Sequence, residues 1–279
     1  MHFGNALTLK FGSSTRHCRQ VDGTVDSQTI ADKFSSHFAS ACSNLSPSGS
    51  ASLTEQYDTM RSSYVGSPLI DEYKIDAQLV EQVIIDMKRG KAAGLDNLTV
   101  EHLQLCHSLL PCVLAKLFNW FVRTGYVPDQ FGLSYTVPLL KTNNICKNLT
   151  VDNFRGISIS PVLSKVFEHC IISRYRQFFV TSDNQFGFKK SVGCSHAIYT
   201  VRSVVDNYIQ CGSTVNLCAI DISKAFDRMN HNGLYIKLMQ RSLPSDLLSV
   251  IENWFDKCFT CVKWNSVFSN RFKLSCGVR

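Results

Sequence analysis

The sequence predicts an α+β fold that is mostly helical and carries short antiparallel strands. Several segments between residues 73 and 255 repeat apolar residues at three- and four-residue spacing, which is typical of amphipathic helices. Two short strand-like runs flank a polar loop at residues 142–152, which indicates a hairpin. A further apolar run, Val215 and Leu217 to Ile220, is long enough for a buried strand.

Composition sets broad limits on the class of protein. With 279 residues and 44% hydrophobic residues, the chain can form one or two domains with a substantial core. The net charge of +7 is compatible with a polyanionic partner but does not require one. We find no signal peptide and no apolar run of 18 residues, so we expect an intracellular, non-secreted chain without a membrane partner. The 12 cysteines lack regular spacing, which favours free thiols, and Cys258 and Cys261 have no second pair at zinc-ribbon spacing.

Residues 1–70 are predicted to be an N-terminal flexible segment. The stretch from Ser46 to Ser52 is rich in serine and is typical of a flexible linker. Before it, Ile30, Phe34 and Phe38 have helical spacing, so they form an apolar patch. This patch can dock either on the main body or on a neighbouring segment, and the sequence does not distinguish the two.

Three helices are predicted between residues 76 and 125. Asp76 caps the first, whose apolar face includes Val80 and Ile84, and Thr99 caps the second. The loop between them is expected to place Gly94 in a left-handed conformation. The third helix has an apolar face between residues 110 and 121 and ends at Gly125.

The predicted hairpin follows. Its first strand, residues 135–141, contains Pro138 and is therefore expected at a sheet edge. Its second strand covers residues 153–159, and a helix then starts at Ser160–Pro161. Lys141 and Arg155 lie at opposite ends of the intervening loop. Isolated basic residues of this kind are usually solvated, but an arginine fork also matches phosphate oxygens.

A turn at residues 183–190 combines two phenylalanines with two lysines. This composition suits nucleic acid, since bases stack on rings and phosphates meet ammonium groups. The alternative is that Phe186 and Phe188 anchor the turn in a core. A helix with an apolar face over residues 197–208 follows and ends at Gly212.

Asp221 comes directly after the apolar run at residues 215–220. Burying an unpaired carboxylate costs roughly several kcal/mol, so a buried acid here needs a partner such as a metal ion. The alternative is a helix cap or a surface acid. Further along, residues 234–239 and 247–255 are predicted to be helices, and residues 259–274 a hairpin that turns near Asn265.

Five blocks resemble the reverse transcriptases of non-LTR (LINE-type) retrotransposons, and they occur in that family's order. The blocks are Lys91–Asp96, the hairpin with Lys141 and Arg155, Asp183–Lys190, Cys218–Asp227 and Gly277–Arg279. The resemblance covers residues 70–279. This sequence departs from the family pattern in having Gly156 after the arginine, a slightly longer hairpin loop and a displaced Gly193.

The resemblance implies roles for individual residues. Asp221 would be catalytic and would bind the two Mg²⁺ ions of nucleotidyl transfer, helped by the carbonyl of Ile222. Lys141 and Arg155 would hold the triphosphate of the incoming dNTP, and Phe226 would lie under its sugar and exclude a 2′-hydroxyl. The implied nucleic-acid contacts are Lys91, Gln185, Phe188 and Lys189.

The resemblance also implies an organisation. Residues 71–210 would be a reverse-transcriptase-like fingers subdomain, and residues 211–279 the start of a palm that is incomplete. Its partners would be an RNA template, a DNA primer and dNTP, with the remaining palm, the thumb and an endonuclease domain belonging to a parent element. No two aspartates are adjacent in the 279 residues, so we expect this chain alone to be inactive as an RNA-directed DNA polymerase.

Two alternatives to an inactive polymerase fragment stay open. The chain can be a non-catalytic RNA-binding or interaction remnant of a retroelement that uses Lys141, Arg155, Lys189 and Lys190. It can also be a decayed product without function, whose exposed apolar sheet surface would aggregate.

Overall fold

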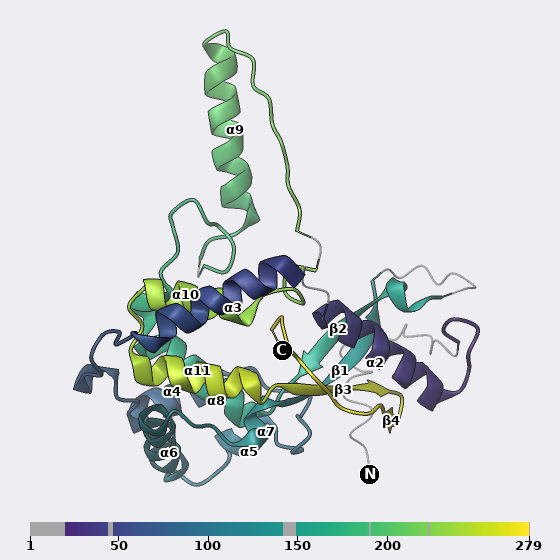
Figure 1. The fold of residues 1–279 in the computed structure, drawn as a ribbon, viewed down its shortest axis with the longest axis vertical. Coiled ribbons are helices and arrows are strands. Elements are labelled where there is room, and N and C mark those ends of the chain that lie inside the picture. The colour runs from purple at the N-terminus through teal and green to yellow at the C-terminus, as the bar shows by residue number, and fades with distance from the viewer. Residues whose placement is uncertain (1–19, 44–46, 142–148, 190, 223, 279) are drawn as a thin grey trace. The chain divides into compact units, whose positions relative to one another are not determined.

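The computed structural model describes residues 20–43, 47–141, 149–189, 191–222 and 224–278 (Figure 1). They form two compact units: unit 1 comprises Met1–Phe178 with Lys224–Arg279, and unit 2 comprises Phe179–Ser223. Helices make up about half of the chain and the strands form one small sheet, which confirms an α+β fold. Within the described ranges, no helix has the length and apolar character needed to cross a bilayer.

The sheet belongs to unit 1 and is mixed. Its strands among the described residues are β1 (Leu133–Leu140), β2 (Phe154–Ile159), β3 (Phe259–Trp264), β4 (Val267–Phe268) and β5 (Phe272–Lys273). The order is β2-β1-β3-β4, and β5 also pairs with β3. β1 and β2 form the predicted antiparallel hairpin, whereas β1 and β3 are parallel. The expectation of antiparallel strands alone was therefore wrong for the β1–β3 pair, which brings together strands more than a hundred residues apart.

The prediction that β1 is an edge strand was also wrong, because β1 lies between β2 and β3. The proline is nevertheless accommodated for a local reason. β3 pairs with β1 only over Leu133–Thr136, so Pro138 lies beyond the last β3 partner and faces Gly156 of β2 alone. At Pro138 one side of β1 is therefore unpaired, as a residue without a backbone N–H requires.

Helix α2 (Ser27–Ser43) resolves where the N-terminal apolar patch docks. Ile30 and Phe34 are completely buried and pack against Val262 and Trp264 of β3 and Phe154 of β2. The Phe34 ring lies 5.0 Å from the Phe154 ring and 5.3 Å from the Trp264 ring, centroid to centroid. The patch therefore covers one face of the sheet of this same chain.

The serine-rich stretch is helical where the structure describes it, so the prediction of a flexible linker there was wrong. Helix α3 (Pro47–Ser62) starts inside that stretch and lies beside α10 (Figure 1). Its second half is tied to helix α11: Tyr57 Oη donates to Glu252 Oε1 at 2.7 Å and Arg61 Nε donates to the same oxygen at 3.0 Å. Tertiary contacts thus outweigh the weak local preference of a serine-rich segment.

The predicted helix starts at Asp76 and Thr99 and the predicted helix end at Gly125 are confirmed. α4 (Ala77–Asp86) starts at Asp76, whose carboxylate accepts from the Leu79 backbone N–H at 2.7 Å. α5 (Val100–Gln104) starts after Thr99, and α6 (Leu110–Thr124) ends at Gly125 with φ of 65°. The 3₁₀ turn η1 (Asp71–Tyr73) precedes these helices, and the short helix α7 (Asp129–Gly132) follows them.

Gly94 has a different role from the one predicted. Its φ is not positive, and Gly90 and Asn97 take the left-handed positions of this loop instead. A Cβ atom on Gly94 would lie 2.9 Å from the backbone of Pro161. The position therefore requires glycine because a distant segment packs directly against the loop, a requirement that the loop sequence does not encode.

An aromatic core joins α6 to the later helices of unit 1. α8 (Val162–Arg174) begins directly after Pro161, close to the predicted start, and presents Phe167 to Phe118 of α6 at 4.8 Å between ring centroids. On its other side Phe167 stacks on Trp254 of α11 at 5.4 Å. The predicted C-terminal elements are confirmed as α10 (His231–Gln240), α11 (Ser245–Asp256) and the β3–β4 hairpin. The remaining 3₁₀ turns are η2 (Val151–Asn153) and η3 (Arg176–Phe179).

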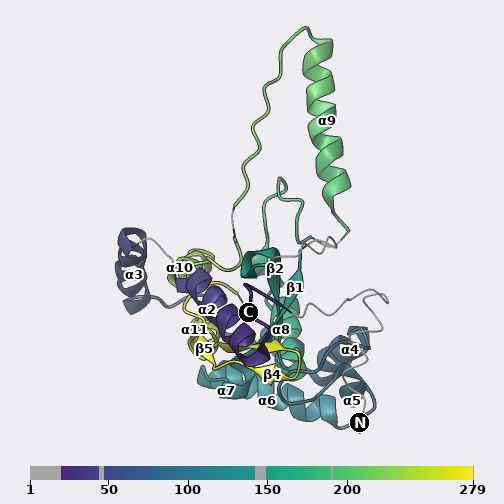
Figure 2. The same cartoon turned by 90° about the vertical axis from the view of Figure 1, so that its right-hand side faces the viewer.

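Unit 2 contains α9 (Cys194–Gln210) and an extended segment that returns in the opposite direction (Figure 2). α9 confirms the predicted helix, although none of its residues is buried. The apolar run at residues 215–220 is not a strand: it has no ladder partner, and Ile220 is 89% exposed. A strand buries its apolar side chains only against paired neighbours, and this run has none in the described residues.

Candidate nucleotide and RNA interface

Lys141 and Arg155 lie on one face of the β1–β2 hairpin. Arg155 pairs with Leu139 across the ladder, and the Lys141 N–H continues that ladder by donating to the Asn153 carbonyl at 2.9 Å. Because side chains alternate along a strand, Lys141 shares a face with Leu139 and hence with Arg155. The two basic side chains are diagonal neighbours, within reach of one phosphate group. Both are exposed to solvent.

The opposite face of the same hairpin is covered by α2. Phe154 packs under Phe34, and the next residue but one, Gly156, has no room for a side chain. A Cβ atom there would lie 2.7 Å from Cγ2 of Thr136 and 3.2 Å from Cζ of Phe38. Glycine replaces the family's proline at this position, and the close packing of α2 accounts for it, because a side chain here would collide with Phe38 of α2 and with Thr136. The same packing fixes the backbone next to Arg155.

The loop with Lys91 lies on the same face as the two basic hairpin residues. Tyr135, which shares the face of Leu139 by alternation, donates from its hydroxyl to the Ala93 carbonyl at 3.0 Å. Ala92 and Leu95 pack against Tyr135 and its cross-strand partner Ile159. The exposed Lys91 thus lies near one end of this face and Lys141 near the other, about 20 Å apart along β1.

Three charged or titratable residues, Lys141, Asp152 and His37, interact at the loop end of the hairpin. Lys141 Nζ donates to the Asp152 carbonyl at 2.6 Å, which holds the side chain beside η2. His37 of α2 lies 3.8 Å from Asp152 Oδ1. Partial burial lowers the pKa of His37, and the nearby charges of Lys224 and Lys141 lower it further, while Asp152 opposes them. His37 is therefore a member of this site that the sequence did not single out, although it immediately precedes Phe38 of the apolar patch.

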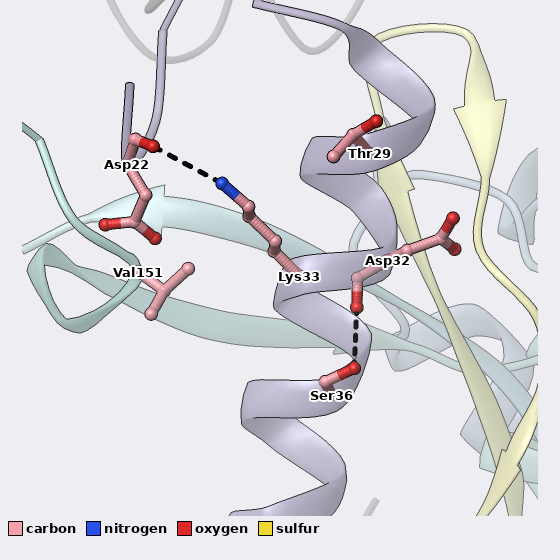
Figure 3. A pocket seen from close by; sticks show the side chains of 6 residues that line it. All are labelled: Asp22, Thr29, Asp32, Lys33, Ser36 and Val151. Carbon is pink, nitrogen blue, oxygen red and sulfur yellow. Dashed lines mark hydrogen bonds between the residues drawn. The ribbon is translucent and has the colours of Figure 1, made fainter. Parts of the chain in front are cut away.

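Among the described residues that line a hollow beside this region, the one cation, Lys33, is already hydrogen-bonded. It lies between α2 and η2 and is lined by Asp22, Thr29, Asp32, Lys33, Ser36 and Val151 (Figure 3). Lys33 Nζ donates to the Asp22 carbonyl at 3.3 Å and to Thr24 Oγ1 at 2.6 Å. The Asp22 N–H in turn donates to the Leu149 carbonyl at 2.8 Å. These bonds tie α2 to the segment before β2, so Lys33 serves the structure of the hairpin.

The turn that carries Phe226 is held by the last described residues. Phe226 O accepts from the Val278 N–H at 2.9 Å, and the Gly277 N–H donates to the Met229 carbonyl at 2.7 Å. Gly277 has φ of 81°, and a Cβ atom there would lie 2.7 Å from Phe226 O. His231 Nε2 forms a 2.8 Å hydrogen bond with the Gly277 carbonyl. The structure therefore joins Phe226, from one recognised block, to Gly277 and Val278, from another, while Phe226 stays 59% exposed.

Asp221 and Ile222 are not delivered by a buried strand. Both are exposed and lie in the extended segment of unit 2. Among the residues that the structure describes, no group of three or more His, Cys, Asp or Glu side chains is arranged to hold a metal ion. A carboxylate is the right kind of oxygen donor for Mg²⁺, but one carboxylate is not a binding site. The role of Asp221 as a ligand of the predicted two-ion centre therefore stays a prediction.

Gln185, Phe188 and Lys189 share one turn of unit 2. Gln185 Nε2 donates to the Gly187 carbonyl at 3.2 Å, and Lys189 Nζ donates to the Ser182 carbonyl at 2.6 Å. Phe188 has φ of 59° and is 92% exposed, so it is not anchored in a core. A bulky residue in the left-handed region is strained, and such strain is frequent at functional positions. The predicted RNA contacts of this turn stay a prediction.

Comparison with known proteins finds similarity to reverse transcriptases. Residues 141–279 match the family described as reverse transcriptase (RNA-dependent DNA polymerase). The chain is 26% identical over 203 residues to the "Probable RNA-directed DNA polymerase from transposon X-element" of Drosophila melanogaster, covering 71% of this chain and 22% of that protein. It is 27% identical over 185 residues to the RNA-directed DNA polymerase from mobile element jockey of Drosophila funebris, covering 63% and 19%. The jockey polymerase of Drosophila melanogaster is 26% identical over 201 residues, covering 70% and 22%. The chain thus spans about a fifth of the length of these relatives.

Proposed function

Residues 141–279 belong to the reverse transcriptase family of non-LTR (LINE-type) retrotransposons, and from that premise we propose that this chain binds the incoming nucleotide and the RNA template of an RNA-directed DNA polymerase. Domains of this family bind an RNA template and a primer. The observation that carries the proposal is the solvent-facing side of the β1–β2 hairpin, where Lys141 and Arg155 are diagonal neighbours.

In this proposal Lys141 and Arg155 bind the triphosphate of a dNTP. The guanidinium matches two phosphate oxygens at once, and the ammonium adds a point charge. α2 supports the arrangement by packing against the opposite face of the hairpin strands. Phe226, in the turn held by Gly277 and Val278, would face the sugar.

The RNA template would contact the remaining predicted residues, namely Lys91, Gln185, Phe188 and Lys189. Lys91 is supported by its place on the same face as Arg155. Phe188 is supported by its exposure, because a base can stack on an accessible ring. The proposal includes residues 71–210 as a fingers-like subdomain, residues 211–279 as the start of a palm, and residues 1–70 as an N-terminal segment. α2 of that segment packs on the hairpin.

We do not assign this chain a complete polymerase reaction. Members of the family generally use divalent metal ions, and Asp221 is the residue of this chain that would contribute a ligand. The described residues offer no metal-ligand cluster around it, and the 279 residues contain no adjacent pair of aspartates. The proposed function of this chain is therefore binding, and the purified chain is expected not to extend a primer.

The test measures binding of a labelled dNTP to the purified chain by equilibrium dialysis. Lys141→Ala and Arg155→Ala are each expected to weaken binding about tenfold, since hydrogen bonds between charged groups contribute roughly 1.5–3 kcal/mol. Lys237→Ala is the matched control, because Lys237 is an exposed lysine on α10. Equal loss in all three variants would indicate non-specific attraction and would contradict the assignment.

A second candidate function is a non-catalytic RNA-binding remnant of a retroelement. The exposure of Asp221 favours it, because the basic residues remain on structured elements while the acid has no assembled site. Primer extension separates the two candidates. RNA binding without dNTP binding or primer extension supports the remnant, whereas extension that is lost in Asp221→Ala establishes a polymerase.

A further inference from the structure

A second cationic and aromatic surface lies on α6 and includes none of the residues assigned above. Along this helix Lys116, Trp120 and Arg123 follow one another at spacings of four and three residues, so they share one face. All three are exposed, and the Trp120 side chain is 52% exposed although tryptophan is usually well buried. Val113 and Leu117 extend the apolar part of this face.

The opposite side of α6 explains why this face is not part of the core. Leu114, Phe118, Phe121 and Val122 already bury the helix against the rest of unit 1. The helix is therefore packed against unit 1 by these four side chains, and burial of Trp120 is not needed for that packing. Both views show α6 at the lower margin of unit 1 (Figures 1 and 2).

Lys116 and Arg123 are the charged side chains of α6, and both are positive. α6 contains no aspartate or glutamate between Leu110 and Thr124. Two carboxylates beside it are each neutralised by a lysine: Lys74 Nζ lies 2.7 Å from Asp71 Oδ1, and Lys257 Nζ lies 3.0 Å from Asp129 Oδ1. The same Lys257 Nζ lies 3.6 Å from the centre of the Tyr126 ring, and that ring is 6.5 Å from the ring of Trp120.

We propose that the Lys116–Trp120–Arg123 face of α6 binds single-stranded RNA, with an unpaired base stacked on Trp120 and the adjoining phosphates held by Lys116 and Arg123. The combination selects this ligand because aromatic rings accept bases of any sequence, and flanking cations follow the phosphate backbone. A paired base cannot reach the ring, so duplex RNA keeps only the charge contacts. The proposal rests on the proposed function in that the ligand is RNA, but it uses none of the same residues.

The tryptophans of the chain provide a direct measurement. Trp120 is exposed, whereas Trp254 and Trp264 are each 7% exposed. Titration of the full chain with an unstructured 12-nucleotide RNA should therefore quench the emission of Trp120, and duplex RNA of the same length should quench it much less. Trp120→Leu removes the ring and is expected to lower the affinity about tenfold.

The charge contacts are tested separately. Lys116→Ala together with Arg123→Ala should weaken binding and make it less dependent on salt, with a change in the logarithmic salt slope of about 0.7 per lost contact. Lys237→Ala on α10 is the matched control and should have no effect. Trp120→Phe keeps an aromatic ring in place, so it should retain RNA binding while losing the emission change. This second variant tests the role of the ring even if Trp120→Leu fails to fold.

The hairpin variants distinguish this inference from the proposed function. In Lys141→Ala and Arg155→Ala the quenching of Trp120 by RNA should persist. If Trp120→Leu and the double charge variant bind RNA like the original chain, this inference is wrong and the proposed function is unaffected. Quenching of Trp120 by polyglutamate to the same extent as by RNA would also overturn it, because charge alone would then account for binding.

Discussion

Helix α2 and the run at residues 215–220 both contain a cluster of apolar residues in the sequence, but the structure buries the first and leaves the second exposed. In α2, Ile30 and Phe34 are completely buried against β2 and β3. In the run at residues 215–220, Leu217 and Ile220 are 72% and 89% exposed, and neither pairs with a strand within the described residues. An apolar pattern therefore shows what a segment is able to bury, and burial itself depends on whether the surface that completes it is present.

The comparison bears on both proposals. The basic face of the hairpin is firmly presented because α2 packs the opposite face, and the residues assigned to nucleotide binding there share one rigid support. Asp221 follows the run that lacks a partner, and the described residues provide it with no other ligands.

The largest effect is expected from removing the ring that anchors α2. Phe34→Ala should destabilise unit 1 by about 3–5 kcal/mol, because it deletes a completely buried aromatic side chain between Phe154 and Trp264. Urea unfolding measured by circular dichroism gives the change in free energy.

The matched substitution is Ile220→Ala in the exposed run. It should change stability by less than about 0.5 kcal/mol, as is usual for an exposed position. Similar losses in the two variants would show that the run at residues 215–220 is buried in solution and would remove the contrast between the two segments.

An intermediate effect is expected where α2 meets the hairpin backbone. Gly156→Ala should cost about 1–3 kcal/mol, because its methyl group would collide with Thr136 and Phe38. It should also weaken dNTP binding by displacing Arg155. Gly187→Ala in unit 2 is the control, since nothing lies within 4 Å of a Cβ atom there. If alanine is tolerated equally at both positions, α2 does not fix the hairpin.

The smallest effect concerns His231, which holds the turn of Phe226 through Gly277. Burial lowers the pKa of His231, and its hydrogen bond with the Gly277 carbonyl opposes this only in part. The unfolded chain, with a histidine pKa of about 6.5, therefore takes up the proton first as the pH falls. The stabilisation is fully present above about pH 6.5 and is lost as the pH decreases through the folded-state pKa.

The measurement is the unfolding midpoint between pH 7.5 and pH 5. The loss of stability at low pH should be smaller in His231→Gln than in the original chain. An identical profile in His231→Gln would show that this buried histidine does not couple the turn to folding.

Local signals predicted local structure well. Asp76, Thr99 and Gly125 begin or end their helices as expected, because capping depends on a few neighbouring residues. The hairpin with Lys141 and Arg155 followed from two short strands across a polar loop, and its ladder places the two side chains on one face. Lys91 lies on the same face as Lys141 and Arg155 because Tyr135 donates a hydrogen bond to Ala93. These two residues are forty-two positions apart in the sequence, so the loop sequence alone did not predict this contact.

The sequence by itself determined several helix ends, such as those at Asp76, Thr99 and Gly125, together with the β1–β2 hairpin and the family, because these depend on short-range spacing and on residues in a fixed order. Only the tertiary structure decided that α2 docks on the sheet, that β3 adds parallel to β1, that Gly94 and Gly156 are needed for close packing, and that Trp120 stays outside the core. Each of these depends on contacts between segments far apart in the chain, and such contacts are selected by which surfaces fit and not by the residues of either segment alone.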